Sequence, residues 1–175
     1  AAPWVIPPQA FQSEDKLNRF TDVAAQTGVD VFELSGGSIL DDFDNDGYLD
    51  LMVSSIGLRH QLRYFHNEAS GAFKDRTLEA GLAGLTGGLN MIQADYNNDG
   101  WTDVLVLRGA WFGPAGHHPN SLLKNNGNGT FSDVTKEAGV LSFHPTQTAV
   151  WLDYNGDGWL DLFIGNDTVG ADRNE

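Results

Sequence analysis

The sequence contains no cysteine, which excludes a disulfide framework and a thiolate metal site. Basic residues are scarce: 10 Lys and Arg stand against 24 Asp and Glu, and the formal net charge is −14. That charge argues against nucleic acid as a partner, since phosphates select basic surfaces, and equally against docking on anionic membranes. No apolar run approaches the roughly 18 residues that suggest a membrane-spanning helix. The acidic balance favours cations as partners.

The chain is long enough for one ordinary domain, with 175 residues of which 41% are hydrophobic. Glycine is abundant, at 21 residues, and the apolar runs between the glycines are short, which indicates many strands and turns. The chain begins "AAPWVIPPQ" without Met, which predicts either a removed targeting segment or a piece of a longer protein. We interpret residues 1–19 as an extended N-terminal arm or linker.

Two phrases recur along the chain. The first reads "DFDNDGYLD" (42–50), "DYNNDGWTD" (95–103) and "DYNGDGWLD" (153–161), and the second reads "FTDVAAQTGV", "FKDRTLEAGL" and "FSDVTKEAGV". The interval from the companion phrase to the next loop is always 22 residues, namely Phe20 to Asp42, Phe73 to Asp95 and Phe131 to Asp153. Two unrelated phrases at one fixed interval indicate an internal structural repeat.

Each unit reads as four short strands, because runs rich in Val, Leu and Ile alternate with turn residues. The segment "NNGNGT" is typical of a hairpin turn, and Gly81 and Gly139 are expected to end single helical turns. Four strands per unit favour an all-β fold made of β-propeller blades with four antiparallel strands. We assign the partial propeller to residues 20–175, with an outer strand at 20–23, full blades at about 37–77 and 89–135, and the start of a third blade at 147–167.

The blade count is too low for a closed ring. A closed propeller needs at least about four blades, and an incomplete ring of about two to three blades leaves raw sheet edges and open faces. The sequence therefore predicts a fragment, a subunit that completes a ring with another chain, or part of a larger protein.

The nine-residue phrase places oxygen atoms at regular positions of a short loop. In the first copy, carboxylates stand at positions 1, 3, 5 and 9, and a glycine at position 6 permits a sharp turn. The backbone carbonyl at position 7 supplies a further oxygen. Oxygen-only ligation on a tight loop suits Ca²⁺, whereas Mg²⁺ demands stricter octahedral geometry and keeps more water. The two positive charges of the ion would offset the crowded aspartates.

We therefore predict three calcium sites, of which the four-carboxylate loop at Asp42 is the tightest. The loop is not an EF-hand, because position 12 is Val53, Val106 or Ile164 instead of a bidentate Glu. The alternative is an Asx-rich turn without metal, which three copies in register disfavour. The expected ligands are Asp42, Asp44, Asp46, Tyr48 (carbonyl), Asp50, Asp95, Asn97, Asp99, Trp101 (carbonyl), Asp103, Asp153, Asn155, Asp157, Trp159 (carbonyl) and Asp161.

These loops resemble the calcium loops of FG-GAP, or VCBS-type, repeats, which form the blades of integrin-α-like propellers. The phrases "NEASGAFKDRTLEAGL" and "NNGNGTFSDVTKEAGV", with "LRGAW" and "HPNSLLKNNGNGTF", resemble the cartilage-acidic-protein-like branch of secreted bacterial and animal proteins. The resemblance spans about residues 20 to 167. It implies a calcium-binding propeller that is extracellular, at the cell surface or periplasmic, and that works in adhesion or as a scaffold. Several members of the family are lectins.

One loop interrupts the repeat, because the second unit has five additional residues within "RGAWFGPAGHHPN". Strand parity places this insertion opposite the aspartate loops, since it joins the second and third strands of its blade. Loops on a rigid scaffold commonly carry function. The alternatives for the histidine pair are a solvated loop and a transition-metal site. The residues expected to meet a partner or ligand are Trp111, Phe112, His117 and His118.

The sequence contains no GxSxG, HExxH, P-loop or Rossmann pattern. We predict a calcium-stabilised extracellular propeller segment that is not an enzyme and serves as a protein-interaction, adhesion or scaffold module. Its expected partner is another protein or the remaining propeller chain, and no nucleic acid or membrane insertion is expected. The first alternative is a lectin-like propeller that binds a glycan through aromatic loop residues. The second is an accessory subunit of a larger enzyme complex.

Overall fold

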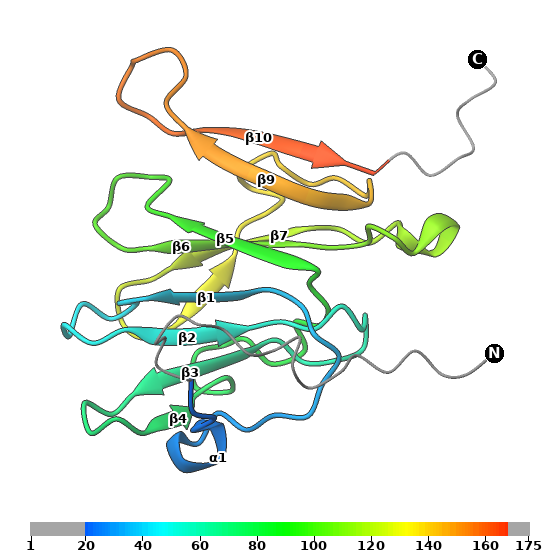
Figure 1. The fold of residues 1–175 in the computed structure, drawn as a ribbon. Coiled ribbons are helices and arrows are strands. Elements are labelled where there is room, and N and C mark those ends of the chain that lie inside the picture. The colour runs from blue at the N-terminus through cyan, green and yellow to red at the C-terminus, as the bar shows by residue number, and fades with distance from the viewer. Residues whose placement is uncertain (1–19, 168–175) are drawn as a thin grey trace, which may run out of the picture.

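The computed structural model describes residues 20–167. Within this range the chain forms two four-stranded antiparallel sheets and one two-stranded antiparallel sheet, and the three sheets are stacked in chain order (Figure 1). The predicted all-β architecture of antiparallel, four-stranded blades is confirmed. The arm predicted over residues 1–19 lies outside the described residues. None of the helices in the described range is long and apolar enough to cross a membrane.

The strands of each sheet are paired in the order in which they occur along the chain. The first sheet contains β1 (Ser38–Asp41), β2 (Asp50–Val53), β3 (Arg63–Asn67) and β4 (Phe73–Asp75). The second contains β5 (Asn90–Ala94), β6 (Asp103–Leu107), β7 (Ser121–Asn125) and β8 (Phe131–Asp133). The third contains β9 (Thr146–Leu152) and β10 (Asp161–Asn166).

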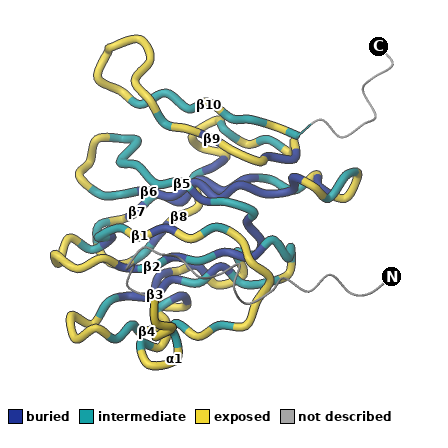
Figure 2. The backbone as a smooth tube through the Cα atoms, in the orientation of Figure 1, coloured by how far each residue is buried: buried dark blue, intermediate teal, exposed yellow. Residues whose placement is uncertain are grey.

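The middle sheet is covered on both faces, and its strand β6 is buried at all five residues (Figure 2). Because side chains alternate across a strand, β6 supplies two separate hydrophobic clusters. Val104 and Val106 pack toward the first sheet, with Met52 among their neighbours. Leu105 and Leu107 belong to a second cluster that includes Ala149 of β9. The continuous apolar run "VLVL" is therefore explained by burial between two blades.

The first strands of the three units lie next to one another, since β1 contacts β5 and β5 contacts β9. The three aspartate loops consequently project from one edge of the stack (Figure 1). The insertion after β6, which contains the short 3₁₀ helix η2 (Gly113–Gly116), projects from the opposite edge (Figure 1). The sheet order thus separates the aspartate loops from the one irregular loop.

Residues 20–23 do not form the outer strand predicted for them. They precede the single helical turn α1 (Ala24–Thr27), and Phe20 is fully exposed. The fourth strands β4 and β8 pair with the third strand of their own unit. Residues 20–23 have no such third strand before them in the described range, so they have no edge on which to pair.

The companion phrase has the same turn in all three copies. The glycine that follows each turn adopts a left-handed conformation, with φ of 83° at Gly28, 76° at Gly81 and 73° at Gly139. A residue with a Cβ would be strained there, which explains the repeated glycine. Only the first copy forms a short α-helix; the other two are hydrogen-bonded turns.

Candidate metal centre

Each aspartate loop joins the first two strands of its sheet and turns twice through left-handed backbone. At position 4 the φ values are 58° for Asn45, 56° for Asn98 and 75° for Gly156. At position 6 glycine has φ of 86–91° in the three loops, at Gly47, Gly100 and Gly158. Glycine and asparagine tolerate this conformation best, so the sequence "N-D-G" or "G-D-G" is what the backbone path requires.

The carboxylate of the first aspartate of each loop lies inside the turn and stabilises it by accepting backbone hydrogen bonds. The carboxylate of Asp42 accepts the backbone N–H groups of positions 5 and 6 at 3.0 and 2.8 Å. Asp95 accepts the equivalent pair at 3.0 and 2.8 Å, and Asp153 does so at 3.1 and 2.8 Å. Hydrogen bonds from the Gly158 N–H and its neighbours lower the pKa of Asp153. All three loops therefore share one hydrogen-bonded frame.

The last aspartate of the first two loops begins a strand and is buried, with Asp50 0% and Asp103 1% exposed. Asp50 accepts the Tyr64 hydroxyl and the Asn67 N–H, both at 2.8 Å. One oxygen of Asp103 accepts the Asn125 N–H at 2.7 Å, while its Oδ2 is buried without a partner. Burial raises the pKa of Asp103 to about 6, because the charged carboxylate has lost water.

These unpartnered oxygens provide a structural test of whether a cation fits. Asp44 Oδ1 in the first loop is also buried without a partner, and burial, with the charges of Asp50 and Asp46, raises the pKa of Asp44. An isolated buried carboxylate is costly unless a cation or a donor offsets it. The donor set of carboxylate, amide and carbonyl oxygens fits a hard divalent cation.

The structure joins the loops to one another. The Asn45 side chain donates to the Gly100 carbonyl at 3.3 Å, and Asn98 donates to the Gly158 carbonyl at 3.2 Å. Position 4 of the first loop therefore contacts position 6 of the second, and position 4 of the second contacts position 6 of the third.

The tryptophans at position 7 differ in their surroundings. Trp101 lies against Gly127 in the glycine turn of its own blade, whereas Trp159 is 57% exposed.

Two asparagines that the sequence analysis missed complete the loops from the ends of the third strands. Asn67 donates from its side chain to the Leu49 carbonyl at 3.0 Å. Asn125 donates to the Thr102 carbonyl at 3.2 Å and to the Phe43 carbonyl at 2.7 Å. The available signal was the shared asparagine that ends "RYFHN" and "SLLKN".

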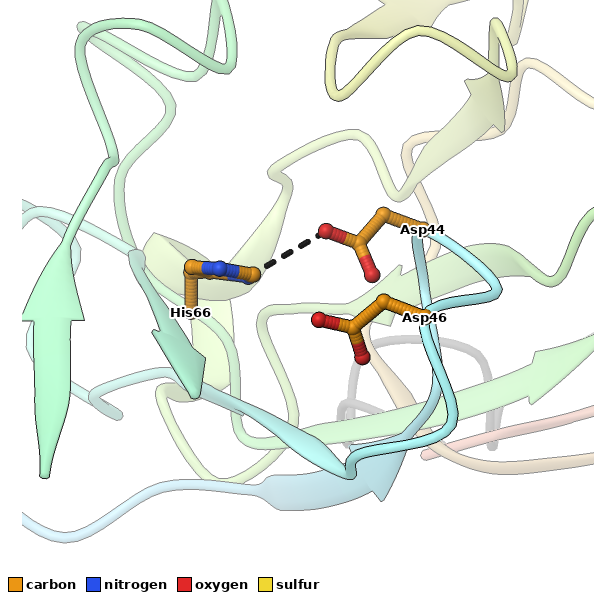
Figure 3. Close-up of side chains that lie close together, drawn as sticks. All are labelled: Asp44, Asp46 and His66. Atoms are coloured by element: carbon orange, nitrogen blue, oxygen red, sulfur yellow. Dashed lines mark ion pairs between the residues drawn. The ribbon is translucent and has the colours of Figure 1, made fainter. Parts of the chain in front are cut away.

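The residues that precede these asparagines, His66 and Lys124, also contact the aspartate loop of their own blade, and the sequence analysis did not assign them to the site either. His66 Nδ1 lies 3.3 Å from an Asp44 oxygen, and Asp44, Asp46 and His66 together form a group that could hold a metal ion (Figure 3). At the same strand position of the second blade, Lys124 forms an ion pair with Asp99 at 3.2 Å. That ion pair raises the pKa of Lys124.

The four residues predicted to meet a ligand are not gathered in one pocket. Trp111 lines a shallow depression with Leu89 and Gln147, whereas His118 lines a different one with Arg108. The loop is fixed at its base, where the Trp111 N–H donates to Asp167 at 3.3 Å. Trp111 is 66% exposed. His117 is also exposed, whereas Phe112 and His118 are half-buried.

The sheets are stacked antiparallel blades, and each has an aspartate-rich loop between its first two strands. This arrangement is that of the blade repeats of the β-propeller class. The chain belongs to the FG-GAP-like repeat family, whose pattern matches residues 42–106 and 110–164. These two segments cover the aspartate loops and most of the strands, which confirms the resemblance seen in the sequence.

Curated relatives carry the name cartilage acidic protein 1. The protein from Xenopus tropicalis is 25% identical over 160 residues, which are 84% of this chain and 23% of the relative. The human and mouse (Mus musculus) proteins are each 33% identical over 96 residues, which are 54% of this chain and 14% of the relative. The chain therefore spans less than a quarter of the length of these relatives.

Proposed function

We propose that this chain is a calcium-stabilised segment of a β-propeller that serves as a non-catalytic, extracellular interaction or scaffold module. The observation that carries the proposal is the hydrogen-bonded frame common to the three aspartate loops, together with the buried, unpartnered oxygens of Asp44 and Asp103. The ion would be held by the carboxylates and amides at positions 1, 3, 5 and 9 and by the carbonyl at position 7.

The proposed extracellular setting agrees with the expected strength of the sites. Calcium sites of extracellular modules have dissociation constants of about 0.1 to 1 mM, which external calcium concentrations can fill. The curated relatives are named cartilage acidic protein 1. This chain has the same acidic character, with a net charge of −14.

The outer face of the third sheet, which points away from the middle sheet, supports the proposed interaction role because it is apolar and exposed. Trp151, Leu162 and Ile164 face the middle sheet and pack against its cluster. On the opposite face Phe163 and Val150, which are paired across the two strands, are 65% and 49% exposed. An apolar sheet face of this kind is typical of a surface that another blade or chain covers. We propose that a further blade, from this protein or from a partner, packs there.

Analytical ultracentrifugation tests that face. We expect the isolated chain to self-associate with rising concentration, and Phe163→Glu to shift the population toward monomer because it places a charge on the apolar face. Leu78→Glu is the matched control, because Leu78 is 74% exposed but lies on the turn after β4. A sharp monomeric peak for the wild-type chain, with cooperative unfolding, would contradict the proposal.

The second candidate function, glycan binding, rests on the insertion. Trp111 is exposed on a loop that the blade pattern does not require, and exposed aromatic rings present large apolar surfaces to ligands. We expect Trp111→Ala to leave the melting temperature within about 2 °C of wild type, because exposed side chains contribute little to stability. Glycan-array signal that disappears in Trp111→Ala but persists in Trp159→Ala would support the lectin function. Unfolding of Trp111→Ala would show that the loop is a packing element.

A further inference from the structure

His66 is a buried histidine whose ring nitrogen Nδ1 has no hydrogen-bond partner. Its side chain is only 10% exposed, and its Nδ1 lies 3.1 Å from an Asp50 oxygen and 3.3 Å from an Asp44 oxygen without forming a hydrogen bond to either. The ring is directed toward the space between Asp44 and Asp46 (Figure 3). Buried polar atoms are normally satisfied, so an unpartnered nitrogen directed at carboxylates requires an explanation.

The first loop also differs from the other two in its ligands. Position 3 is Asp44 here, whereas it is Asn97 or Asn155 in the other loops. Asp44 Oδ1 is buried without a partner, as is the His66 nitrogen. His66 at the end of β3 and Asp44 in the first loop therefore each have one buried polar atom without a hydrogen-bond partner, and both residues belong to the same group that could hold a metal ion.

The second blade shows the alternative arrangement at the same strand position. Lys124 stands where His66 stands, and its ammonium group pairs with Asp99 of its own loop at 3.2 Å. The lysine supplies a fixed positive charge, which reduces the demand of that loop for an ion. The imidazole of His66 instead offers a ring nitrogen that can bind a metal ion, which increases the number of ligands available at the first loop.

We propose that Asp44, Asp46 and His66 form a site for a divalent transition-metal ion of the Zn²⁺ class, which displaces Ca²⁺ from the first loop. Imidazole nitrogen is a preferred ligand for Zn²⁺, whereas Ca²⁺ selects oxygen atoms almost alone. This inference deepens the proposed function and rests on its premise that the first loop binds a cation.

The observed spacing agrees with one shared ion. Donors bound to Zn²⁺ at about 2.0 to 2.2 Å lie about 2.8 to 3.6 Å apart when the angle between them is tetrahedral or right-angled. The separation of 3.3 Å between His66 Nδ1 and Asp44 Oδ2 falls in that range. One donor atom from each of the three side chains lies within 4.8 Å of the others, and the group is therefore compact enough to hold one metal ion.

Calorimetric titration of ZnCl₂ into the full chain, held in excess calcium, tests the site. We expect one Zn²⁺ ion to bind per chain, with an affinity that falls about 100-fold or more in His66→Lys, because loss of even an outer-shell partner of a metal ligand costs about 10- to 100-fold. His66→Lys copies the residue of the second blade. His144→Lys is the matched control, since it makes the same substitution at an exposed histidine.

A second measurement needs no variant. X-ray absorption of the zinc-loaded wild-type chain is expected to show one imidazole in the first coordination shell. Zinc affinity unchanged by His66→Lys, or a shell of oxygen alone, would overturn the inference and leave His66 as an ion-pair partner of Asp44 and Asp50. The two proposals fail separately. Calcium binding without His66-dependent zinc binding contradicts only this inference. His66-dependent zinc binding without calcium binding contradicts the calcium sites and the displacement of Ca²⁺, but it supports the zinc site itself.

Discussion

Removal of calcium is expected to lower the melting temperature by about 10 to 30 °C. An ion that binds only the folded state stabilises it by RT ln(1 + [L]/Kd), which is about 1.4 to 2.7 kcal/mol per site when the ion is at 10 to 100 times its Kd. Three such loops contribute about 4 to 8 kcal/mol, and each kcal/mol shifts the melting temperature of a domain of this size by about 2 to 4 °C.

Differential scanning calorimetry in calcium and in EDTA measures this effect, with magnesium at the same concentration as the ion control. Asp103→Asn provides an internal comparison. In EDTA it is expected to melt no lower than wild type, because it removes a buried charge whose pKa is raised to about 6. In calcium it is expected to melt lower, because one ligand is lost. Identical melting curves in calcium and EDTA would contradict calcium stabilisation.

The backbone path of the loops could be predicted from the sequence because it is encoded within nine consecutive residues. The left-handed positions at Asn45 and Gly47 and the carboxylate frame of Asp42 all follow from local residue types. The contributions of His66 and Asn67 could not be predicted in the same way. They depend on where the third strand ends relative to the loop, and the pairing of β3 with β2 decides that position.

The insertion and the segment before α1 likewise depend on contacts with distant parts of the chain, which the local sequence does not reveal. The sequence correctly isolated "RGAWFGPAGHHPN" as irregular, but it grouped Trp111 with His118, which line separate depressions. Gly109 and Gly116 approach so closely that a Cβ on either would meet the other's carbonyl oxygen, and this contact folds the loop back on itself. The strand predicted at 20–23 required a pairing edge, which a local pattern cannot reveal.

The aromatic residue at position 2 of the first two loops has a role in packing that the sequence analysis did not assign. Phe43 is 1% exposed and packs edge-on against Tyr64 and Phe131, with ring centroids 6.0 and 5.8 Å away. Tyr96 in the second loop stacks on Trp151 of the next sheet at 5.8 Å. The aspartate loops are therefore connected directly to the packing between blades.

Phe43→Ala is expected to destabilise the chain by about 3 to 5 kcal/mol, because deletion of a fully buried phenyl ring leaves a cavity. The cavity lies between the first two sheets, where Tyr64 and Phe131 also contact each other at 5.9 Å. Urea denaturation in calcium measures the change in the free energy of unfolding. Tyr154→Ala is the matched control: Tyr154 occupies position 2 of the third loop but is 75% exposed, so its loss is expected to change stability by less than about 0.5 kcal/mol.

The same substitution tests the connection between packing and metal binding. Phe43 lies between the ligands Asp42 and Asp44, and its carbonyl accepts the Asn125 side chain from the second blade at 2.7 Å. Loss of the ring frees both neighbouring carboxylates to move, so the cation affinity of the first loop is expected to fall about 10-fold, as it does when a supporting group is lost. Calcium titration of Phe43→Ala below its unfolding temperature measures this affinity. Affinity equal to wild type, together with the loss of stability, would show that the ring supports the blade interface alone.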